Sequence, residues 1–202
     1  MAALRRVLAL AALLAARPAA AQPLAPWSNH IAEASARFGV PAEWIRRVIR
    51  AESNGRTMWL GRPTVSRAGA MGLMQVMPGT WRELRAAYGL GPDPHHPHDN
   101  ILAGTAYLRA MYDRFGYPGV FAAYNAGPAR YALYLSGSRS LPAETRSYVA
   151  AVTSGSRAPA VSRRRAPARI FALAPAREPS QLVQQRPAAD GLFVRLSSPA
   201  SR

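Results

Sequence analysis

The sequence predicts a mainly α-helical domain with one small irregular or β-hairpin insertion. Residues that commonly begin and end helices recur between residues 27 and 153. The segment 101–115 repeats apolar side chains at spacings of three and four residues, which is typical of an amphipathic helix. The stretch from Asn54 to Gly72 is rich in Gly, Ser, Thr and Arg and is expected to form the irregular loop or hairpin.

Capping residues delimit the expected helices in the first half of the domain. Ser28 can cap a helix that ends at Gly39, and Pro41 fits the first position of the next helix. Thr80 is expected to cap a third helix, which ends at Gly89.

A longer helix is expected in the second half of the domain. Asp99 or Asn100 is expected to cap it, and Gly116 to end it. Its apolar stripe consists of Ile101, Thr105, Leu108, Tyr112 and Phe115. Three shorter helices are expected to follow, over residues 118–125, 129–135 and 143–152.

Composition restricts the classes of function. The 202 residues include 26 basic residues, all of them arginine, and 10 acidic ones, which gives a net charge of +16. A charge of this size favours a polyanionic partner such as nucleic acid, a membrane surface or an acidic cell-wall polymer. The sequence contains no cysteine, which excludes disulfides, thiolate metal sites and a cysteine nucleophile.

Both ends of the sequence differ from the domain between them. Residues 1–21 are typical of a secretory signal peptide, because Arg5 and Arg6 precede an apolar run and small residues form a cleavage site before Gln22. Export to the periplasm or secretion is therefore expected, with residues 22–153 as the folded domain. Residues 154–202 form a basic tail rich in Pro, Ala and Arg that is expected to be mostly disordered.

The tail carries much of the positive charge. It contains nine arginines and two acidic residues. This composition favours a tether to an anionic membrane or wall surface over a sequence-specific reader of nucleic acid. No nucleic-acid partner is expected for an exported chain, and the protein is expected to be a monomer.

One acidic residue lies on the apolar side of an expected helix. Glu52 continues the stripe formed by Ile45, Val48 and Ile49, whereas three arginines occupy the opposite side. Burial and the negative end of the helix dipole both disfavour a charged carboxyl group, so the pKa of Glu52 is expected to be raised. A carboxyl group that is neutral near pH 7 can serve as a general acid.

A plainer interpretation of Glu52 is that it lies in solvent beyond the helix or pairs with a neighbouring arginine. Glycoside-cleaving enzymes commonly pair the acid with a second carboxylate. The other acidic residues of the domain lie at expected helix starts, beside polar faces or in a proline-rich loop, where capping or surface pairing explains them. The sequence therefore offers one well-placed carboxyl group without an evident partner.

Four sequence blocks follow one another along the chain: Glu52-Ser53, then Ala68-Gly69-Ala70-Met71-Gly72-Leu73-Met74-Gln75-Val76-Met77-Pro78, then Ala123-Tyr124-Asn125-Ala126-Gly127, then Glu144-Thr145-Arg146-Ser147-Tyr148-Val149. Together they resemble the soluble lytic transglycosylase family of peptidoglycan-cleaving enzymes, over about residues 28 to 152. The resemblance implies a helical domain of the goose-type lysozyme-like fold. The segment from Asn54 to Arg67 departs from the family pattern, because it is slightly long, basic and contains Trp59; it could reshape the substrate subsites.

The resemblance implies that Glu52 is the only catalytic acid and base. Ser53 is implied to hydrogen-bond near the sugar or to steady Glu52. Gln75, together with Met74, is implied to line the cleft and to contact sugar hydroxyl or acetamido groups. The methionines also recur every three residues, so Met74 could instead be a packing residue.

Tyr124 and Asn125 are implied to form the other wall of the cleft, and Tyr148 to orient Glu52 or the substrate. Each also has a structural interpretation. The two tyrosines could be ordinary core aromatics, and Asn125, which precedes a Gly-Pro turn, is a natural residue for a helix end.

The implied reaction cleaves the β-1,4 bond between N-acetylmuramic acid and N-acetylglucosamine in peptidoglycan glycan strands and forms 1,6-anhydro-N-acetylmuramic acid. Two alternatives are a muramidase of the same fold, which admits water, and a cell-wall-binding scaffold without turnover. No cofactor is expected. His95, His96 and His98 lie beside Asp99, but the proline among them and the lack of an i, i+4 spacing favour a solvated loop, so no metal is expected.

Overall fold

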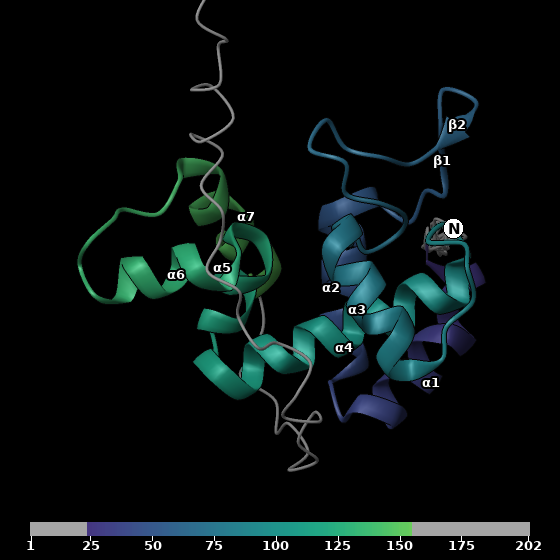
Figure 1. The fold of residues 1–202 in the computed structure, drawn as a ribbon, viewed down its shortest axis with the longest axis horizontal. Coiled ribbons are helices and arrows are strands. Elements are labelled where there is room, and N and C mark those ends of the chain that lie inside the picture. The colour runs from purple at the N-terminus through teal and green to yellow at the C-terminus, as the bar shows by residue number, and fades with distance from the viewer. Residues whose placement is uncertain (1–23, 155–202) are drawn as a thin grey trace, which may run out of the picture. The chain divides into compact units, whose positions relative to one another are not determined.

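The computed structural model describes residues 24–154, which form seven α-helices, one 3₁₀ helix and a two-stranded hairpin (Figure 1). The elements are η1 (Ala25–Trp27), α1 (Ser28–Phe38), α2 (Ala42–Ser53), β1 (Met58–Trp59), β2 (Arg62–Pro63), α3 (Pro78–Tyr88), α4 (Pro97–Phe115), α5 (Gly119–Ala126), α6 (Pro128–Leu135) and α7 (Ala143–Thr153). The expected signal segment, and the expected tail after Ser154, lie outside the described residues.

The mainly helical fold with one small insertion is confirmed. The insertion contains the β1–β2 hairpin, in which Met58 pairs with Pro63 and Trp59 pairs with Arg62 in antiparallel register. Leu60 and Gly61 form its two-residue turn, and both have positive φ angles, 49° and 75°, as the twist of a tight hairpin requires.

The expected N-caps of the first, third and fourth helices are wrong. Ser28 is the first residue of α1 rather than its cap, and Pro41 precedes the first residue of α2. α3 begins at Pro78 and α4 begins at Pro97, so each helix starts before the polar residue that was expected to cap it. Proline is favoured in the first turn of a helix because its missing N–H has no intrahelical partner there. Asn100 consequently lies within α4, where it is fully buried, and Asp99 lies in the first turn.

α4 is the central element of the described fold and contacts α1, α3 and α5 (Figure 1). Ile101, Thr105 and Leu108 of its expected stripe are buried, but so are Leu102 and Ala106 between them. A helix that has neighbours on several sides buries more than one stripe. α4 therefore supports both the elements before it and those after it.

α2 is tied to the rest of the domain by aromatic packing. Trp44, in its first turn, is almost fully buried, and its ring lies 5.2 to 5.6 Å from the rings of Tyr112, Tyr117 and Phe121. Such aromatic clusters bury a large apolar area. The packing fixes the direction of α2, and with it the position of the residues in its last turn, where α2 also contacts α7.

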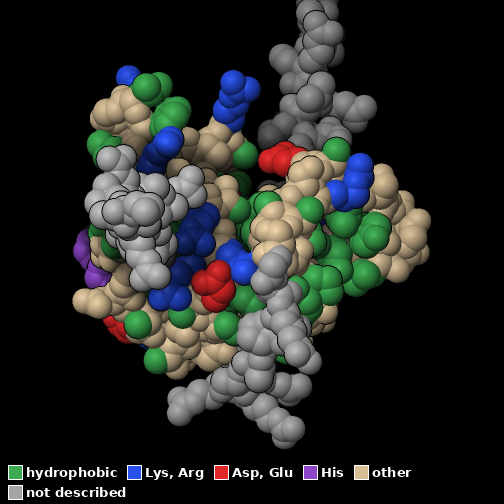
Figure 2. Space-filling view, turned by 180° about the vertical axis from the view of Figure 1, so that it is seen from behind, with side chains coloured by type: hydrophobic (Ala, Val, Ile, Leu, Met, Phe, Trp, Pro, Cys, Tyr) green, Lys and Arg blue, Asp and Glu red, His purple; other side chains and the backbone are tan. Residues whose placement is uncertain are grey.

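The surface of residues 24–154 is basic with local apolar areas. Figure 2 shows basic side chains gathered on one face beside apolar ones. Large exposed apolar residues occur mainly in the hairpin and in α6: Met58, Trp59, Leu60, Leu133, Tyr134 and Leu135. None of the helices between residues 24 and 154 has the length and apolarity that a bilayer crossing requires.

The packing of α4 against the segment before α3 depends on a glycine. A Cβ atom added at Gly104 would lie 2.5 Å from Met74 Cβ and 2.6 Å from Met74 Sδ. We expect Gly104→Ala to destabilise the domain by about 1 to 3 kcal/mol, because the overlap outweighs the gain in helix propensity. Urea unfolding followed by circular dichroism measures this change.

Gly79→Ala is the matched control for this substitution, since Gly79 also lies in a helix and an added Cβ there meets no atom within 4 Å. We expect the control to leave the free energy of unfolding unchanged or slightly higher. Equal stability of the two variants would contradict the close packing of Gly104 on Met74.

Candidate active site

Glu52 lies in the last turn of α2, at the end of the buried stripe that includes Ile45, Val48 and Ile49. The stripe carries the Glu52 side chain toward the interior, while the end of the helix leaves it partly accessible. Asn54 ends the helix in a left-handed conformation, with φ of 52°, and turns the chain away. Glu52 as a whole is therefore partly buried.

The pKa of Glu52 is raised from 4.5 to about 7. Burial is the main cause, because it removes water that would stabilise the carboxylate. Tyr148 acts in the opposite direction and lowers the pKa, and the negative charge of Glu144 raises it slightly further. The predicted neutral carboxyl group is thus supported by its surroundings, and near pH 7 it can both give and take a proton.

Tyr148 on α7 is the polar neighbour of Glu52. Its hydroxyl is buried and makes no hydrogen bond of standard geometry with a described residue, yet it lies near enough to Glu52 to influence that carboxyl group. Burial, followed by the charge of Glu52, raises the pKa of Tyr148 well above 10. Tyr148 therefore stays protonated and can donate to the carboxylate.

Ser53 uses its hydroxyl inside the protein. The Oγ atom donates to the Leu73 carbonyl at 2.8 Å, with the Ile49 carbonyl as a longer alternative at 3.2 Å, and it accepts from the Gly55 N–H at 3.2 Å. These bonds join the end of α2 to the segment before α3. Both expected roles of Ser53, steadying Glu52 and contacting the sugar, stay predictions.

Tyr124 links the two sides of the site. Its hydroxyl donates to the Met74 carbonyl at 2.8 Å, and this joins α5 to the segment before α3. Burial, and then the charge of Glu52, raises the pKa of Tyr124 well above 10. Met74 was expected to line the cleft with Gln75, but its side chain is fully buried against Gly104, so in this structure it belongs to the core.

A hollow lies between the segment before α3 and the end of α5. It is lined by Gln75, Val76, Met77, Thr80, Tyr107, Tyr124, Asn125, Ala126 and Gly127. The expected residues Gln75, Tyr124 and Asn125 are thus brought together. Glu52 and Tyr148 are not among the lining residues of this hollow, but Tyr124 is, and the charge of Glu52 acts on the pKa of Tyr124.

The two amide side chains of the hollow are held by hydrogen bonds. Gln75 has a left-handed backbone, with φ of 49°, and its Nε2 donates to the Gly72 carbonyl at 2.7 Å. Asn125 Oδ1 accepts from the Thr145 hydroxyl at 2.8 Å. The Gln75 amide oxygen and the Asn125 amide nitrogen make no other hydrogen bond within residues 24–154, so an acceptor and a donor are left for a ligand.

Sequence reasoning missed three residues that build the site. Asn100 donates to the carbonyls of Met71 and Pro94 and accepts from the Met74 N–H. Thr145 orients Asn125, and the Tyr107 ring lies 5.2 Å from the ring of Tyr124. The sequence did contain a signal for two of them. Asn100 is a polar residue within an apolar helix, and Thr145 lies in the last of the four sequence blocks.

Within the described residues, two groups of at least three His, Asp or Glu side chains are close enough to share a metal ion. One contains His30, Glu33 and His98, and the other contains His96, His98 and Asp99. Neither includes Glu52. The interpretation of the histidines as a solvated loop needs correction for His98, which lies in the first turn of α4.

Comparison with known proteins agrees with this geometry. A family model described as "Transglycosylase SLT domain" matches residues 29–146. The soluble lytic murein transglycosylase of Salmonella typhimurium is 40% identical over 42% of this chain and 16% of its own length. The Escherichia coli K12 protein of that name is 36% identical over 54% of this chain and 19% of its own length. The transglycosylase of phage PRD1 is 36% identical over 45% of this chain and 30% of its own length.

Solved structures show the same fold. The 70 kDa soluble lytic transglycosylase from Escherichia coli has a TM-score of 0.56 and is 32% identical, covering 65% of this chain and 23% of that one. An inactive glutamate-to-glutamine mutant of lytic transglycosylase Slt from Pseudomonas aeruginosa has a TM-score of 0.55 and is 31% identical, with the same coverage. The chain thus corresponds to less than one third of the length of each of these proteins.

The surroundings of Glu52 predict opposite effects of two substitutions on its pKa. We expect Tyr148→Phe to raise the pKa of Glu52 above about 7, because the hydroxyl that stabilises the carboxylate is removed. We expect Glu144→Gln to lower it, because a like charge is removed. A titration of the Glu52 carboxyl carbon by NMR measures both shifts.

Tyr134→Phe, in the exposed part of α6, is the control and should leave the titration unchanged. A wild-type Glu52 that titrates near 4.5, or a titration that neither variant moves, would contradict this description of the site.

Proposed function

Because this chain belongs to the transglycosylase SLT domain family, as the match over residues 29–146 shows, we propose that residues 22–153 form a catalytic domain that cleaves peptidoglycan. The bond is the β-1,4 linkage between N-acetylmuramic acid and N-acetylglucosamine, and the product is 1,6-anhydro-N-acetylmuramic acid. The single observation that carries this proposal is the partly buried Glu52, with a pKa of about 7, whose charge acts on Tyr124 in the lining of the hollow.

The substrate class is supported by the relatives. The curated proteins from Salmonella typhimurium and Escherichia coli are murein transglycosylases by name. A glutamate-to-glutamine change is recorded as inactivating in the Pseudomonas aeruginosa protein, which fits a reaction that depends on one carboxyl group. We assign that role to Glu52 in this chain.

The first step uses neutral Glu52 as an acid. The carboxyl group gives its proton to the oxygen that joins the two sugars, and the bond to C1 breaks with oxocarbenium character. Glu52 becomes a carboxylate in a shielded position, where its charge is disfavoured by burial. The Tyr148 hydroxyl, which stays protonated, can then donate a hydrogen bond to it.

The second step uses the Glu52 carboxylate as a base. It takes the proton of the C6 hydroxyl of the same muramic acid residue, and this oxygen attacks C1 and closes the anhydro ring. An internal nucleophile of good orientation has an effective concentration of about 10⁵ to 10⁸ M, which can replace an activated water. Glu52 recovers its proton, so one carboxyl group suffices for the whole cycle.

The hollow offers a match for an acetamido group. This group presents one N–H donor and one carbonyl acceptor. Gln75 holds an amide oxygen available as acceptor, and Asn125 holds an amide nitrogen available as donor, each fixed by a hydrogen bond at its other end. Groups fixed in advance lose little entropy on binding, so the pair is suited to select N-acetylated sugars.

The hairpin provides a further surface beside the hollow. Trp59 is 57% exposed, and the Arg56 guanidinium lies 5.0 Å from the centre of its ring. The Thr64 carbonyl, which follows β2, accepts from the Gly72 N–H at 2.9 Å, so the hairpin is attached to the segment that carries Gln75. We assign the hairpin to glycan binding away from the cleavage point.

Two other assignments complete the proposal. Export to the periplasm or to the exterior is consistent with relatives that act on murein by name. The arginine-rich tail is proposed to hold the protein at an anionic membrane or wall surface. Both rest on residues outside the described part of the chain.

A muramidase is the rival reaction. It would use the same Glu52 but would admit water to C1, and this normally requires a second carboxylate to activate the water. Glu144, whose charge raises the pKa of Glu52, is the candidate among the described residues, but it is exposed, and so are Glu33, Glu43 and Glu83. This arrangement favours the internal hydroxyl as nucleophile.

The products distinguish these functions. We expect the wild-type protein to release anhydro-muropeptides from purified sacculi, and Glu52→Gln to lower the rate by at least about 10³-fold, because the amide can neither give nor take the proton. Mass spectrometry of the released fragments measures both. Reducing products heavier by one water would support the muramidase, and full turnover by the variant would defeat the assignment of Glu52.

The free energy of unfolding shows whether Glu52→Gln still folds. A raised pKa means that the neutral form is preferred in the folded state, so the contribution of Glu52 is complete below pH 4.5 and is lost as pH rises through about 7. Glu52→Gln removes this loss. The variant should therefore match the wild type near pH 4.5 and be more stable at pH 8, by up to ~3 kcal/mol.

The pH dependence of cleavage follows from the same group. We expect kcat/KM to fall as pH rises through about 7, because the free enzyme loses the proton that the first step requires. Tyr148→Phe should move this fall to higher pH. Initial rates on soluble glycan fragments across pH 5 to 9 measure the profile, and a rate that rises across that range would oppose a general-acid role.

A further inference from the structure

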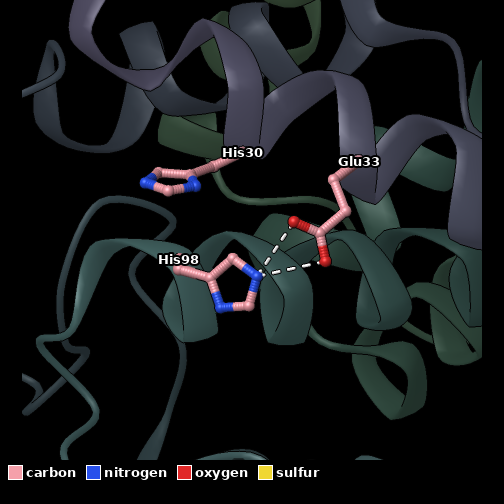
Figure 3. Close-up of side chains that lie close together, drawn as sticks. All are labelled: His30, Glu33 and His98. Carbon is pink, nitrogen blue, oxygen red and sulfur yellow. Dashed lines mark hydrogen bonds and ion pairs between the residues drawn. The ribbon is translucent and has the colours of Figure 1, made fainter.

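Two helices bring three metal-ligating side chains together on the face where they pack. His30 and Glu33 are three residues apart on α1, so both project from the same side of the helix. His98 lies in the first turn of α4, and α1 packs against α4. Figure 3 shows the His30 and His98 rings and the Glu33 carboxylate turned toward a common space between the helices.

The distances suit a shared ion. His98 Nε2 lies 3.0 and 3.1 Å from the two oxygens of Glu33. One ligand atom from each of His30, Glu33 and His98 lies within 4.8 Å of the others. Ligands of a tetrahedral zinc ion at about 2.0 to 2.1 Å stand roughly 3.3 Å apart, so small side-chain rotations complete the geometry.

A second observation points the same way. His98 Nδ1 lies 2.9 Å from Asp99 Oδ1, and the other Asp99 oxygen accepts from the Gly91 N–H at 2.9 Å. A carboxylate that holds one ring nitrogen as a donor fixes the orientation of the ring, and this is the usual support for a metal-binding histidine. Without an ion, Nε2 donates its own proton to Glu33, and a metal ion would displace that proton. Asp99 thus prepares His98 Nε2 to face His30 and Glu33.

We propose that His30, Glu33 and His98 bind one divalent transition-metal ion, with Zn²⁺ as the best match to two imidazoles and a carboxylate, and with water completing the coordination. The site is separate from Glu52. The ion connects α1 to the first turn of α4, two residues before Asn100, which holds the segment containing Met74. Its role is to stabilise the base on which the active site rests.

The overlapping group of His96, His98 and Asp99 is a poorer site. Asp99 would have to give up its bond to His98 Nδ1, and His96 Nδ1 lies 3.7 Å from Asp99 in a side chain that is 58% exposed. The sequence analysis expected no metal because residues 95–99 alone lack a suitable spacing. The partners of His98 come from α1, more than 60 positions earlier in the chain.

The test is titration of the full chain, free of any polyhistidine tag and stripped with EDTA, with ZnCl₂ in a calorimeter. We expect one ion per chain and a rise in the melting temperature when zinc is present. Glu33→Gln and His30→Gln should each weaken zinc binding by at least about tenfold, and Asp99→Asn by about 10- to 100-fold. The ¹⁵N signal of His98 Nε2 should move on binding, while Nδ1 keeps its proton.

Two variants serve as controls. Glu43→Gln removes an exposed carboxylate from α2 and should leave zinc affinity unchanged, and so should His96→Gln. Absence of saturable binding at one equivalent would overturn the proposal, because His98 would then be only a partner of Glu33 and Asp99 in ion pairs. Loss of affinity in His96→Gln but not in His30→Gln would place the ion on the other group and would also overturn it. Circular dichroism of each variant verifies the fold.

Discussion

The burial of one carboxyl group at the end of an apolar helix stripe is the constraint on which the site depends. The stripe of α2 packs into the core and takes Glu52 with it, so the same contacts that stabilise the helix also remove water from the acid. Charge on such a group is costly, and only Tyr148 lowers that cost among the causes that act on its pKa. Stability and proton transfer are therefore coupled at position 52.

Much of the fold could be predicted from local patterns. Helix ends at glycine, the stripes of the second and fourth helices, and an irregular segment over 54–72 all depend on neighbours in sequence, and the structure agrees with them. The N-caps failed at Thr80 and Asp99 because a proline two residues earlier already satisfies the first turn. At these positions a proline and a polar cap residue each predict a different helix start, and the sequence alone does not show which one prevails.

The site was predictable only in part, because its supports are long-range. Glu52, Gln75, Tyr124 and Asn125 could be named from motifs, but Asn100 acts through carbonyl and amide groups 26 to 29 residues away. Met74 was named from a motif as a cleft residue, but its side chain packs against Gly104 of α4. The motif contains no information on that distant glycine. His98 gains His30 and Glu33 as neighbours only when α1 and α4 pack.

The hydrogen bond from the Tyr124 hydroxyl to the Met74 carbonyl ties α5 to the segment before α3, and both of these line the hollow. It spans from one wall to the other in a buried position, where leaving both groups without partners costs about 1 to 3 kcal/mol. The hydrogen bond therefore opposes any separation of these two walls. Room for adjustment lies instead in the hairpin, where the side chains of Trp59 and Leu60 are exposed.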